Sequence, residues 1–468
     1  MNAPHEAVLD QAAIRFKLNG AEVRAIPGET ILDVADRLGV EIPRLCHKPG
    51  LRPDGNCRSC MVEIKGERVL APSCCRAPAA GMEVASDSAR AKHAQKMVVE
   101  LLASDVPERV YKPDSELERW RLRLGVASTR FPQREQPAAD LSHPAMAVNL
   151  DACIQCTRCV RACREVQVND VIGYALRGAD AKIAFDLDDP MGESTCVGCG
   201  ECVQACPTGA LSPKTHVGSQ KVDRKVDSVC PFCGVGCLVT YNVRGEKIIS
   251  VEGRDGPANR GRLCVKGRFG FDYAHHPQRL TVPLVRRPGA AKDWQDPARP
   301  GDWREGFREA SWDEALDFAA GKLASLRDGH GPKALAGFGS AKGSNEEAYL
   351  FQKLVRTGFG SNNVDHCTRL CHASSVAALL EGVGSGAVSN PVRDVEHAEL
   401  ILVIGSNPTA NHPVAATWMK NAAKRGAKIV LADPRVTDIG RHAWRVLQFR
   451  PDTDVAMLNA LIHTVIEE

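Results

Sequence analysis

The segment CIQCTRCVRAC, residues 153–163, places four cysteines at the spacing Cys-x2-Cys-x2-Cys-x3-Cys. The same spacing recurs in CVGCGECVQAC, residues 196–206, which Pro207 follows. Thiolates are soft ligands, and four of them at these intervals are typical of a 4Fe–4S cluster. A zinc knuckle could explain one such run, but two runs with the same spacing favour paired iron–sulfur clusters. We therefore predict that residues 149–222 form a small electron-transfer domain.

The ligand sets follow from the resemblance of these two runs to bacterial two-cluster ferredoxins, in which the fourth cysteine of each run ligates the other cluster. The resemblance implies one cluster held by Cys153, Cys156, Cys159 and Cys206. It implies a second cluster held by Cys163, Cys196, Cys199 and Cys202. This exchange of ligands keeps two redox centres close together in one domain, which suits an electron relay.

The composition is that of a soluble protein with several domains. The chain has 468 residues, which are 44% hydrophobic and 25% charged, and its formal net charge is +3. This near-neutral charge does not favour nucleic-acid binding. No stretch approaches the roughly 18 consecutive apolar residues of a membrane span, and the N-terminus shows neither a signal-peptide pattern nor a twin arginine. We predict a cytoplasmic location, where the 19 cysteines would stay reduced and bind metal rather than form disulfides.

The first 88 residues combine a hairpin, a helix and four cysteines. Alternating apolar residues at 14–18 and the turn Asn19-Gly20 predict the hairpin, and Thr30 predicts the start of the helix. The cysteines that follow suit a 2Fe–2S cluster, with zinc as the alternative: Cys46, Cys57, Cys60 and Cys74. The segment resembles the ferredoxin domain that begins the large iron–sulfur subunit of respiratory NADH dehydrogenase and iron-only hydrogenases. That resemblance implies a β-grasp fold.

Residues 89–148 are predicted to be a helical connector, with an amphipathic helix near residues 97–102. In the resembled families this region often carries a further 4Fe–4S site with one histidine and three cysteines. No cysteine lies between Cys75 and Cys153. We therefore predict that this site is absent and that His93 and His143 are surface residues.

A third cysteine group lies in residues 223–285, which are predicted to be a small β-rich domain with strands near 238–243 and 248–251. Its spacing suits another 4Fe–4S cluster, and its members are Cys230, Cys233, Cys237 and Cys264. From about residue 226 onward the sequence resembles the molybdopterin-guanine-dinucleotide oxidoreductases. The resemblance implies that Lys266 lies between this cluster and the pterin, on the electron path. An exposed surface lysine is the alternative.

Residues 286–468 alternate apolar strands with helices, which predicts an α/β domain with a parallel sheet. The expected strands are 334–338, 400–404 and 428–431, and ligands of such sheets bind in the loops after the strands. The glycines near residue 338 do not match a dinucleotide fingerprint, so we assign no NAD to this chain. The predicted fold class is multidomain α+β and α/β: a β-grasp 2Fe–2S ferredoxin, a two-cluster ferredoxin, a β-rich 4Fe–4S domain and an incomplete pterin-dinucleotide-binding domain.

The pair Cys371-His372 is the most consequential feature of this last domain. A thiolate is a suitable ligand for a metal already bound by pterin sulfurs, and a histidine can accept a proton near neutral pH. Taken alone, a Cys-His pair is more often structural. In context the pair resembles the formate dehydrogenase signature, which implies that Cys371 ligates molybdenum or tungsten and that His372 assists proton removal. Cys367 is predicted to be a core thiol.

Several polar residues resemble the family's contacts to one guanine dinucleotide. Carboxylates accept hydrogen bonds from guanine N–H groups, arginine binds phosphate, and glycine permits close approach of the backbone to the ligand. The expected contacts are Asn345, Gly405, Ser406, Asn407, Asp433, Arg435 and Asp452. For Asp433 and Asp452, helix capping is the alternative.

Together these resemblances imply an NAD-linked formate dehydrogenase that oxidises formate to carbon dioxide. Its expected cofactors are one 2Fe–2S cluster, three 4Fe–4S clusters and a molybdenum or tungsten bis(molybdopterin guanine dinucleotide), and its expected partners are flavin- and NAD-binding iron–sulfur subunits. One alternative is a cytoplasmic nitrate reductase of the same superfamily, and another is a non-catalytic electron-transfer subunit. The sequence stops in a predicted helix and family members are considerably longer, so we expect a fragment of a full subunit.

Overall fold

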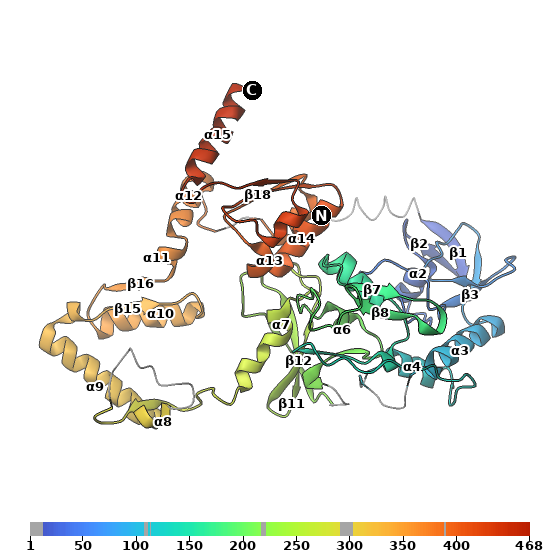
Figure 1. Cartoon of the computed structure of the whole chain (residues 1–468), viewed down its shortest axis with the longest axis horizontal. Coiled ribbons are helices and arrows are strands. Elements are labelled where there is room, and N and C mark those ends of the chain that lie inside the picture. The colour runs from blue at the N-terminus through green and yellow to red at the C-terminus, as the bar shows by residue number, and fades with distance from the viewer. Residues whose placement is uncertain (1–12, 107–110, 113, 217–220, 291–302, 388–389) are drawn as a thin grey trace. The chain divides into compact units, whose positions relative to one another are not determined.

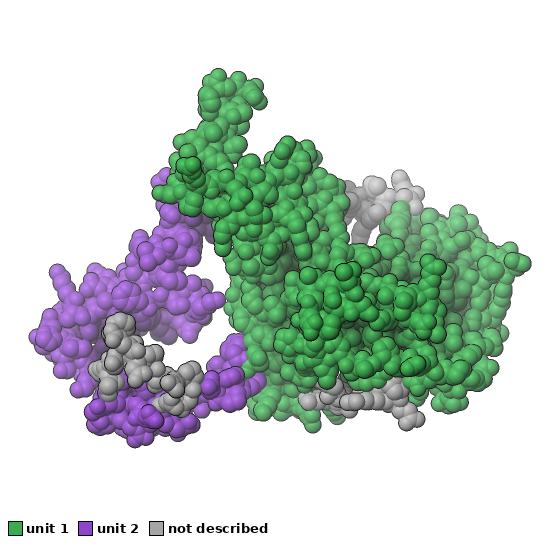
Figure 2. Space-filling model, viewed as in Figure 1, with its two compact units in different colours: residues 1–272, 391–468 green, residues 273–390 purple. Residues whose placement is uncertain are grey.

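The computed structural model describes residues 13–106, 111–112, 114–216, 221–290, 303–387 and 390–468. Residues Met1–Asp272 and Pro391–Glu468 belong to one unit, and Tyr273–Asn390 belong to a second (Figure 2). No helix among the described residues is both long and apolar enough to cross a membrane. The domain boundaries expected from sequence within these units stay predictions.

The amino-terminal sheet is built around the predicted hairpin. Asn19 and Gly20 both have positive φ, at 51° and 84°, as a tight hairpin turn requires. Thr30 begins the predicted helix with a capping box, since its side chain and that of Asp33 each bind the other's backbone N–H. The five strands have the order β2-β1-β5-β3-β4. They are β1 (Ile14–Leu18), β2 (Ala21–Ala25), β3 (Met61–Ile64), β4 (Ala71–Pro72) and β5 (Glu83–Ala85). Helix α2 (Ile31–Arg37) belongs to the same domain, and it is labelled with β1, β2 and β3 in Figure 1.

The connector contains α3 (Ala89–Ser104) and α4 (Glu116–Arg123), so its helices are longer than the one expected at 97–102. His93 is exposed, as predicted. The prediction for His143 is wrong, because this residue is only 8% exposed. Its Nδ1 accepts the backbone N–H groups of Ala145 and Met146 at 3.1 and 3.2 Å, which fixes the turn into the next strand. Nothing in the local sequence pattern distinguishes this role from a surface position.

The two cysteine runs fold into one small domain because its first and last strands pair. Strands β6 (Met146–Val148) and β9 (Leu211–Pro213) are antiparallel, as are β7 (Ile172–Ala175) and β8 (Lys182–Phe185). The pairing of β6 with β9 brings the end of the second run beside the start of the first. The short helices α5 (Arg158–Arg161) and α6 (Glu201–Ala205) carry the third cysteine of each run, and the π-helical turn η2 (Ala162–Gln167) carries Cys163.

The third group of cysteines frames a three-stranded antiparallel sheet in the order β10-β11-β12. Its strands are β10 (Arg224–Val229), β11 (Leu238–Arg244) and β12 (Lys247–Gly253), and helix α7 (Val265–Phe269) follows Cys264. The same unit ends in a parallel sheet, β17 (Leu400–Ile404), β18 (Lys428–Ala432) and β19 (Arg445–Leu447), with helices α13 (Pro408–Asn411), α14 (Pro413–Lys424) and α15 (Asp454–Glu467). The strands expected at 400–404 and 428–431 are therefore present and parallel.

The described residues of the second unit form two small sheets, each of two strands. Strands β13 (Leu284–Arg286) and β14 (Phe307–Glu309) are antiparallel, whereas β15 (Gly337–Gly339) and β16 (Val364–His366) are parallel. The strand expected at 334–338 begins later, because Pro332–Ala334 form a 3-10 turn. The helices of this unit are α8 (Trp303–Gly306), α9 (Trp312–His330), α10 (Asn345–Lys353), α11 (Thr368–Cys371) and α12 (Ala373–Val383).

Candidate redox site

The four cysteines of the first group gather at one end of the β-grasp sheet. The Cys46 backbone N–H lies 3.3 Å from Cys57 Sγ, and the Cys46 thiol also hydrogen-bonds Cys74, which in turn hydrogen-bonds Cys60. The hydrogen bonds from Cys57 and Cys74 lower the pKa of Cys46 and so favour its thiolate. Neighbouring Cys75 is exposed. The structure thus brings together the four sulfur donors predicted for the 2Fe–2S cluster, and their role as ligands stays a prediction.

The first cysteine group is tied to the ferredoxin domain by buried arginines. The Arg161 guanidinium donates to the carbonyl of Cys46 at 2.6 Å and to that of Cys156 at 3.1 Å. Arg158 donates to the carbonyl of His47 and pairs with Glu116, 2.7 Å away. Because one guanidinium binds the backbone of both cysteine groups, their separation is fixed. The sequence gives no signal for this role, since arginines between cluster cysteines are equally compatible with the surface.

The eight cysteines of the ferredoxin domain form the two sets expected from ligand exchange. Cys206 lies with the first set, and a small cavity is lined by all four of its members: Cys153, Cys156, Cys159 and Cys206. Cys163 lies close enough to Cys196, Cys199 and Cys202 to act on the pKa of each of them. Burial, together with the neighbouring Cys206 thiol, raises the pKa of Cys156 to about 12. Four crowded, buried thiolates need a compensating cation, so the donor chemistry fits iron.

The third set of cysteines packs into a core with β11 and β12. The Cys230 backbone N–H donates to the Cys237 carbonyl at 2.9 Å, and Cys233 and Cys264 lie close to both. Lys266 is half-buried in the next helix. Its Nζ donates to the carbonyls of Ala410 and Asn411 at 3.3 and 3.2 Å. The lysine therefore joins the third cysteine set to α13, which follows the loop of Gly405, Ser406 and Asn407.

Within the part of the chain that the structure describes, no three His, Cys, Asp or Glu side chains meet as ligands of a single metal ion. An iron–sulfur cluster spreads its thiolates over several iron atoms, so its cysteines surround a volume instead. The four cysteine sets are compatible with that arrangement.

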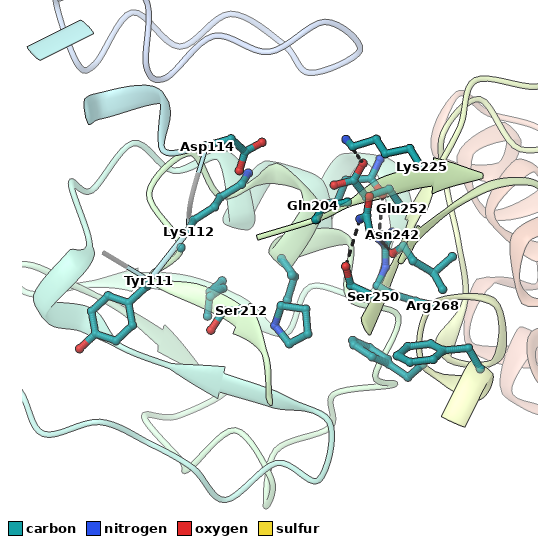
Figure 3. Close-up of a pocket in the computed structure, with 18 of the residues that line it drawn as sticks. Tyr111, Lys112, Asp114, Gln204, Ser212, Lys225, Asn242, Ser250, Glu252 and Arg268 are labelled. Carbon is teal, nitrogen blue, oxygen red and sulfur yellow. Dashed lines mark hydrogen bonds and ion pairs between the residues drawn. The ribbon is translucent and has the colours of Figure 1, made fainter. Parts of the chain in front are cut away.

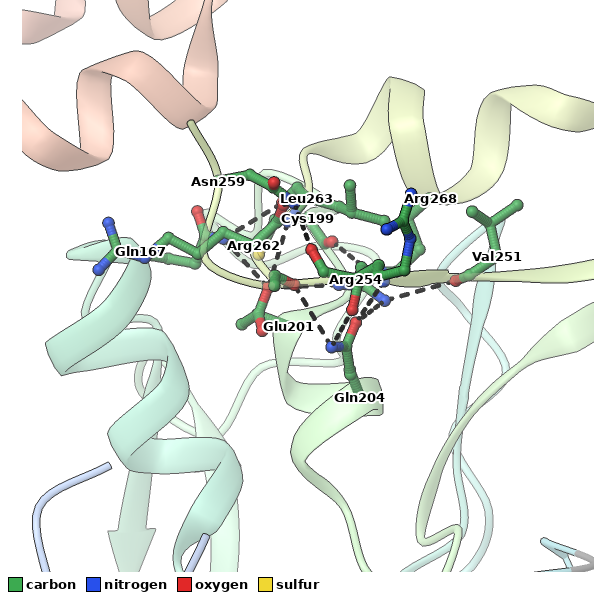
Figure 4. A network of polar contacts seen from close by, with 12 residues as sticks. Gln167, Cys199, Glu201, Gln204, Val251, Arg254, Asn259, Arg262, Leu263 and Arg268 are labelled. Carbon is green, nitrogen blue, oxygen red and sulfur yellow. Dashed lines mark hydrogen bonds and ion pairs between the residues drawn. The ribbon is translucent and has the colours of Figure 1, made fainter. Parts of the chain in front are cut away.

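A buried polar network connects the second cysteine set to the third (Figure 4). Glu201, between Cys199 and Cys202, pairs with Arg268 at 3.2 Å, and both side chains are almost fully buried. Arg268 also donates to the Cys199 carbonyl at 2.9 Å and to Gln204 at 2.7 Å. Since Arg268 lies in the helix after Cys264, this network fixes the third domain against the ferredoxin domain. Neither Glu201 nor Arg268 is predicted from the sequence, because each lies beside cluster cysteines without a pattern of its own.

The predicted catalytic pair lies in the second unit, and it is exposed. Cys371 ends α11, and His372 lies between α11 and α12 with an exposed side chain. The prediction that Cys367 is a core thiol is wrong, since this residue is exposed and begins the same short helix. Its Sγ instead accepts the Ala341 backbone N–H at 3.3 Å. Asn345 is the first residue of α10 and is also exposed.

The other expected dinucleotide contacts lie in loops after the parallel strands of the first unit. The Gly405 N–H donates to the carbonyl of Ala432 at 3.0 Å, so the loops after β17 and β18 lie side by side. Asp433 is buried, and its carboxylate accepts the Arg435 backbone N–H at 2.8 Å. It therefore shapes a turn rather than capping a helix. Asp452 has a φ of 67°, and Thr453 is the residue at the start of α15.

A cavity of about 350 Å³ lies between the ferredoxin domain and the β10–β12 sheet (Figure 3). Asn242 donates to Ser250 at 3.0 Å on its wall, and Lys225 pairs with Glu252 at 3.4 Å. None of the cysteines discussed above lines this cavity, and neither does Lys266. Arg268 and Gln204 line it, so the cavity borders the buried polar network but contains none of the cysteines.

Four family descriptions match consecutive segments of the chain. "2Fe-2S iron-sulfur cluster binding domain" matches residues 11–89, and "NADH-quinone oxidoreductase subunit 3, ferredoxin-like domain" matches residues 143–212. "Molybdopterin oxidoreductase Fe4S4 domain" matches residues 223–276, and "Molybdopterin oxidoreductase" matches residues 279–468. The chain therefore combines ferredoxin-like iron–sulfur domains with a molybdopterin oxidoreductase domain. The predicted resemblance to molybdopterin oxidoreductases with an NADH dehydrogenase-like iron–sulfur front end is confirmed, and so is the multidomain fold class.

Curated relatives align with almost the whole chain. "Probable oxidoreductase YjgC" of Bacillus subtilis (strain 168) is 32% identical over 96% of this chain and 49% of its own length. "Putative formate dehydrogenase YrhE" of the same strain is 30% identical over 98% of this chain and 50% of its own length. The chain spans about half the length of the curated relatives it matches. Among solved structures, an NAD+-reducing NiFe-hydrogenase in its H2-reduced state aligns with 45% of this chain and 92% of its own, at 25% identity and a TM-score of 0.42.

Proposed function

We propose that this chain oxidises formate to carbon dioxide within a molybdenum- or tungsten-pterin enzyme and passes the electrons through its cysteine-bound clusters. The observation that carries the proposal is the presence of Cys371-His372 in a molybdopterin oxidoreductase segment that follows four sets of cluster-type cysteines. Relatives named as formate dehydrogenases, at about 30% identity, support the choice of substrate.

The cofactor assignment uses residues whose chemistry fits each group. The four cysteine sets would hold one 2Fe–2S and three 4Fe–4S clusters, and Cys371 would ligate the pterin-bound metal. When bound, that metal supplies the two-electron oxidation, in which formate gives carbon dioxide, one proton and two electrons. The imidazole of His372 accepts the proton, since its exposed ring can receive it and release it to solvent. Lys266, two residues after Cys264, would contact the pterin on the electron path.

Most of the expected dinucleotide contacts lie in the strand-end loops of the first unit. Gly405, Ser406 and Asn407 leave room for a close backbone approach, and Asp433 with Arg435 offers a carboxylate and a guanidinium in the neighbouring loop. Asp452 would add a contact from the loop before α15. Asn345, the first residue of α10, stays an expected contact of the second unit by itself. A substitution of Asp433 by Asn should weaken retention of the dinucleotide without changing iron content.

The electron acceptors would be flavin- and NAD-binding iron–sulfur partner subunits in the cytoplasm. The support is the order of the front end, a 2Fe–2S domain followed by a ferredoxin-like domain described for subunit 3 of NADH-quinone oxidoreductase. The resemblance of this order to the large iron–sulfur subunit of NADH dehydrogenase is what suggests such partners. Co-purification of a flavoprotein that reduces NAD with formate is the expected result.

Turnover by the full-length protein, purified without oxygen, tests the proposal. Formate-dependent reduction of a dye, together with molybdenum or tungsten in the preparation, is expected. Turnover of nitrate but not formate would contradict the proposal and indicate a nitrate reductase. Iron without molybdenum or tungsten, and no turnover of either substrate, would replace it by a non-catalytic electron-transfer subunit.

A further inference from the structure

Helix α14, far along the chain from the cysteine runs, caps the turn that carries Cys163. Lys424 Nζ donates to the Arg164 carbonyl at 2.7 Å, and Asn421 donates to the Val166 carbonyl at 3.2 Å. Lys420 Nζ donates to three oxygens, the carbonyls of Gln167 and Val168 and the side chain of Asn169. The last carbonyls of a helix have no partner within the helix and carry partial negative charge, so they attract cations.

Lys420 differs from the other two donors because it is buried, with 5% of its surface exposed. Its neighbour Lys424 is exposed and lies 3.8 Å from Asp170, which offsets its charge. No carboxylate pairs with Lys420 among the residues that the structure describes. The ammonium group of Lys420 is therefore a buried positive charge that only neutral oxygens solvate.

The buried ammonium group of Lys420 lies at a cavity that cysteines of two sets also line. Lys420 lines a cavity of about 430 Å³ together with Cys199 of the second cysteine set, Cys264 of the third, Lys266 and Arg441. Burial and the charge of Arg441 lower the pKa of Lys420 to about 8, whereas the thiols of Cys199 and Cys163 oppose this shift. In a medium of low dielectric, a positive charge stabilises the more negative, reduced form of a nearby cluster.

We propose that the positive charge of Lys420 raises the reduction potential of the cluster held by Cys163, Cys196, Cys199 and Cys202. Lys420 would act on this cluster through its charge without being a ligand. The inference rests on the proposed cluster assignment and adds a regulator that lies outside the cysteine runs. Through Lys420, the α/β segment that follows the third domain sets the energy of one step in the electron relay.

An anaerobic redox titration of the full chain, followed by electron paramagnetic resonance, tests this role. The signal of this cluster is first identified by the change in its line shape in Cys196→Ser. In Lys420→Gln, which keeps a donor but removes the charge, the reduced-to-oxidised ratio of that cluster at the wild-type midpoint should fall about tenfold. A tenfold change corresponds to about 59 mV for a one-electron couple. The ratios of the other clusters should change much less.

Two matched variants separate charge from structure. Lys420→Arg keeps the charge and should stay within about twofold of the wild-type ratio. Asn421→Ala removes a neighbouring donor without changing charge and should also leave the ratio unchanged. Should Lys420→Gln lose the cluster, Arg441→Gln removes another cation from the same cavity and should lower the ratio in the same direction.

An unchanged ratio in Lys420→Gln with intact signals would overturn the inference and leave the proposed function standing. An equal shift in Asn421→Ala would overturn it too, because the effect would then be structural. A wild-type protein without any 4Fe–4S signal would overturn the proposed function together with this inference, so the two failures are distinguishable.

Discussion

The cysteines of the first unit and the Cys371-His372 pair of the second unit lie in opposite environments. Most of the first are buried, and backbone carbonyls around them are bound by arginine or lysine side chains from other domains. Cys371 and His372 lie exposed at the junction of two helices in which no residue is buried. The cysteine sets of the first unit are therefore held by contacts with distant segments, whereas Cys371 and His372 lie where the described residues bury nothing. The difference predicts that substitutions in the two regions fail in different ways.

The largest effect should come from Cys371→Ser in the full-length enzyme. Formate-dependent dye reduction should be lost, because the hard hydroxyl is a poor replacement for the thiolate ligand. Iron content and the iron–sulfur spectra should stay unchanged, since no relay cysteine is touched. Activity assays with parallel iron analysis measure both. Retention of turnover at the wild-type rate would remove Cys371 from the site.

His372→Asn should have the next largest effect. Loss of a positioned proton acceptor lowers turnover by about 10²–10⁴-fold. Metal and iron content should match the wild-type protein, and His93→Asn, at an exposed position in the connector, is the matched control. Steady-state kinetics with formate over a range of pH are the measurement. An equal loss in both variants would show that the effect is not specific to this histidine.

Arg268→Gln tests the buried polar network of the first unit. It leaves Glu201 buried without its partner, and breaking a buried ion pair costs about 3–5 kcal/mol of unfolding free energy. The control is Arg164→Gln, which breaks an exposed pair with Asp170 and should cost less than about 1 kcal/mol. Thermal or denaturant unfolding of the two variants compares them. Equal stabilities would contradict the role of the buried network in joining the domains.

The smallest expected effect is a loss of stability on removing a helix cap, and it should differ between two helices that begin with the same kind of cap. Thr30 and Ser344 each form a capping box, but α2 buries four of its side chains and α10 buries none. Thr30→Ala should cost about 1 kcal/mol, because α2 is part of the β-grasp core. Ser344→Ala should cost less, since local fraying of α10 exposes little apolar surface. Hydrogen exchange of the two helices resolves the difference.

The sequence predicted the parts of this molecule that depend on local spacing. These parts are the cysteine sets, the Asn19-Gly20 turn, the Thr30 cap and the strands at 400–404 and 428–431. Each is indicated by residue types or a residue spacing that favour that structure locally. The structure brings together each of the predicted cysteine sets. It also places the loops of Gly405 and Asp433 side by side, as neighbouring parallel strands require.

What the sequence did not predict depends on contacts between distant segments. Arg161, Arg268 and Lys420 bind carbonyls between about 70 and 250 positions away, and no local pattern separates them from surface cations. The surface prediction for His143 follows from the lack of cysteines between Cys75 and Cys153, which argues against a cluster ligand but says nothing about burial. The core prediction for Cys367 follows from its position one helical turn before Cys371, yet the residue begins a short exposed helix.

The iron and acid-labile sulfide content of the anaerobically purified chain tests the central claim most directly. One 2Fe–2S and three 4Fe–4S clusters correspond to about 14 iron atoms and as many sulfides per chain. The account predicts this content, with paramagnetic signals of both cluster types after reduction. Zinc in place of iron, or cysteines joined as disulfides, would contradict it.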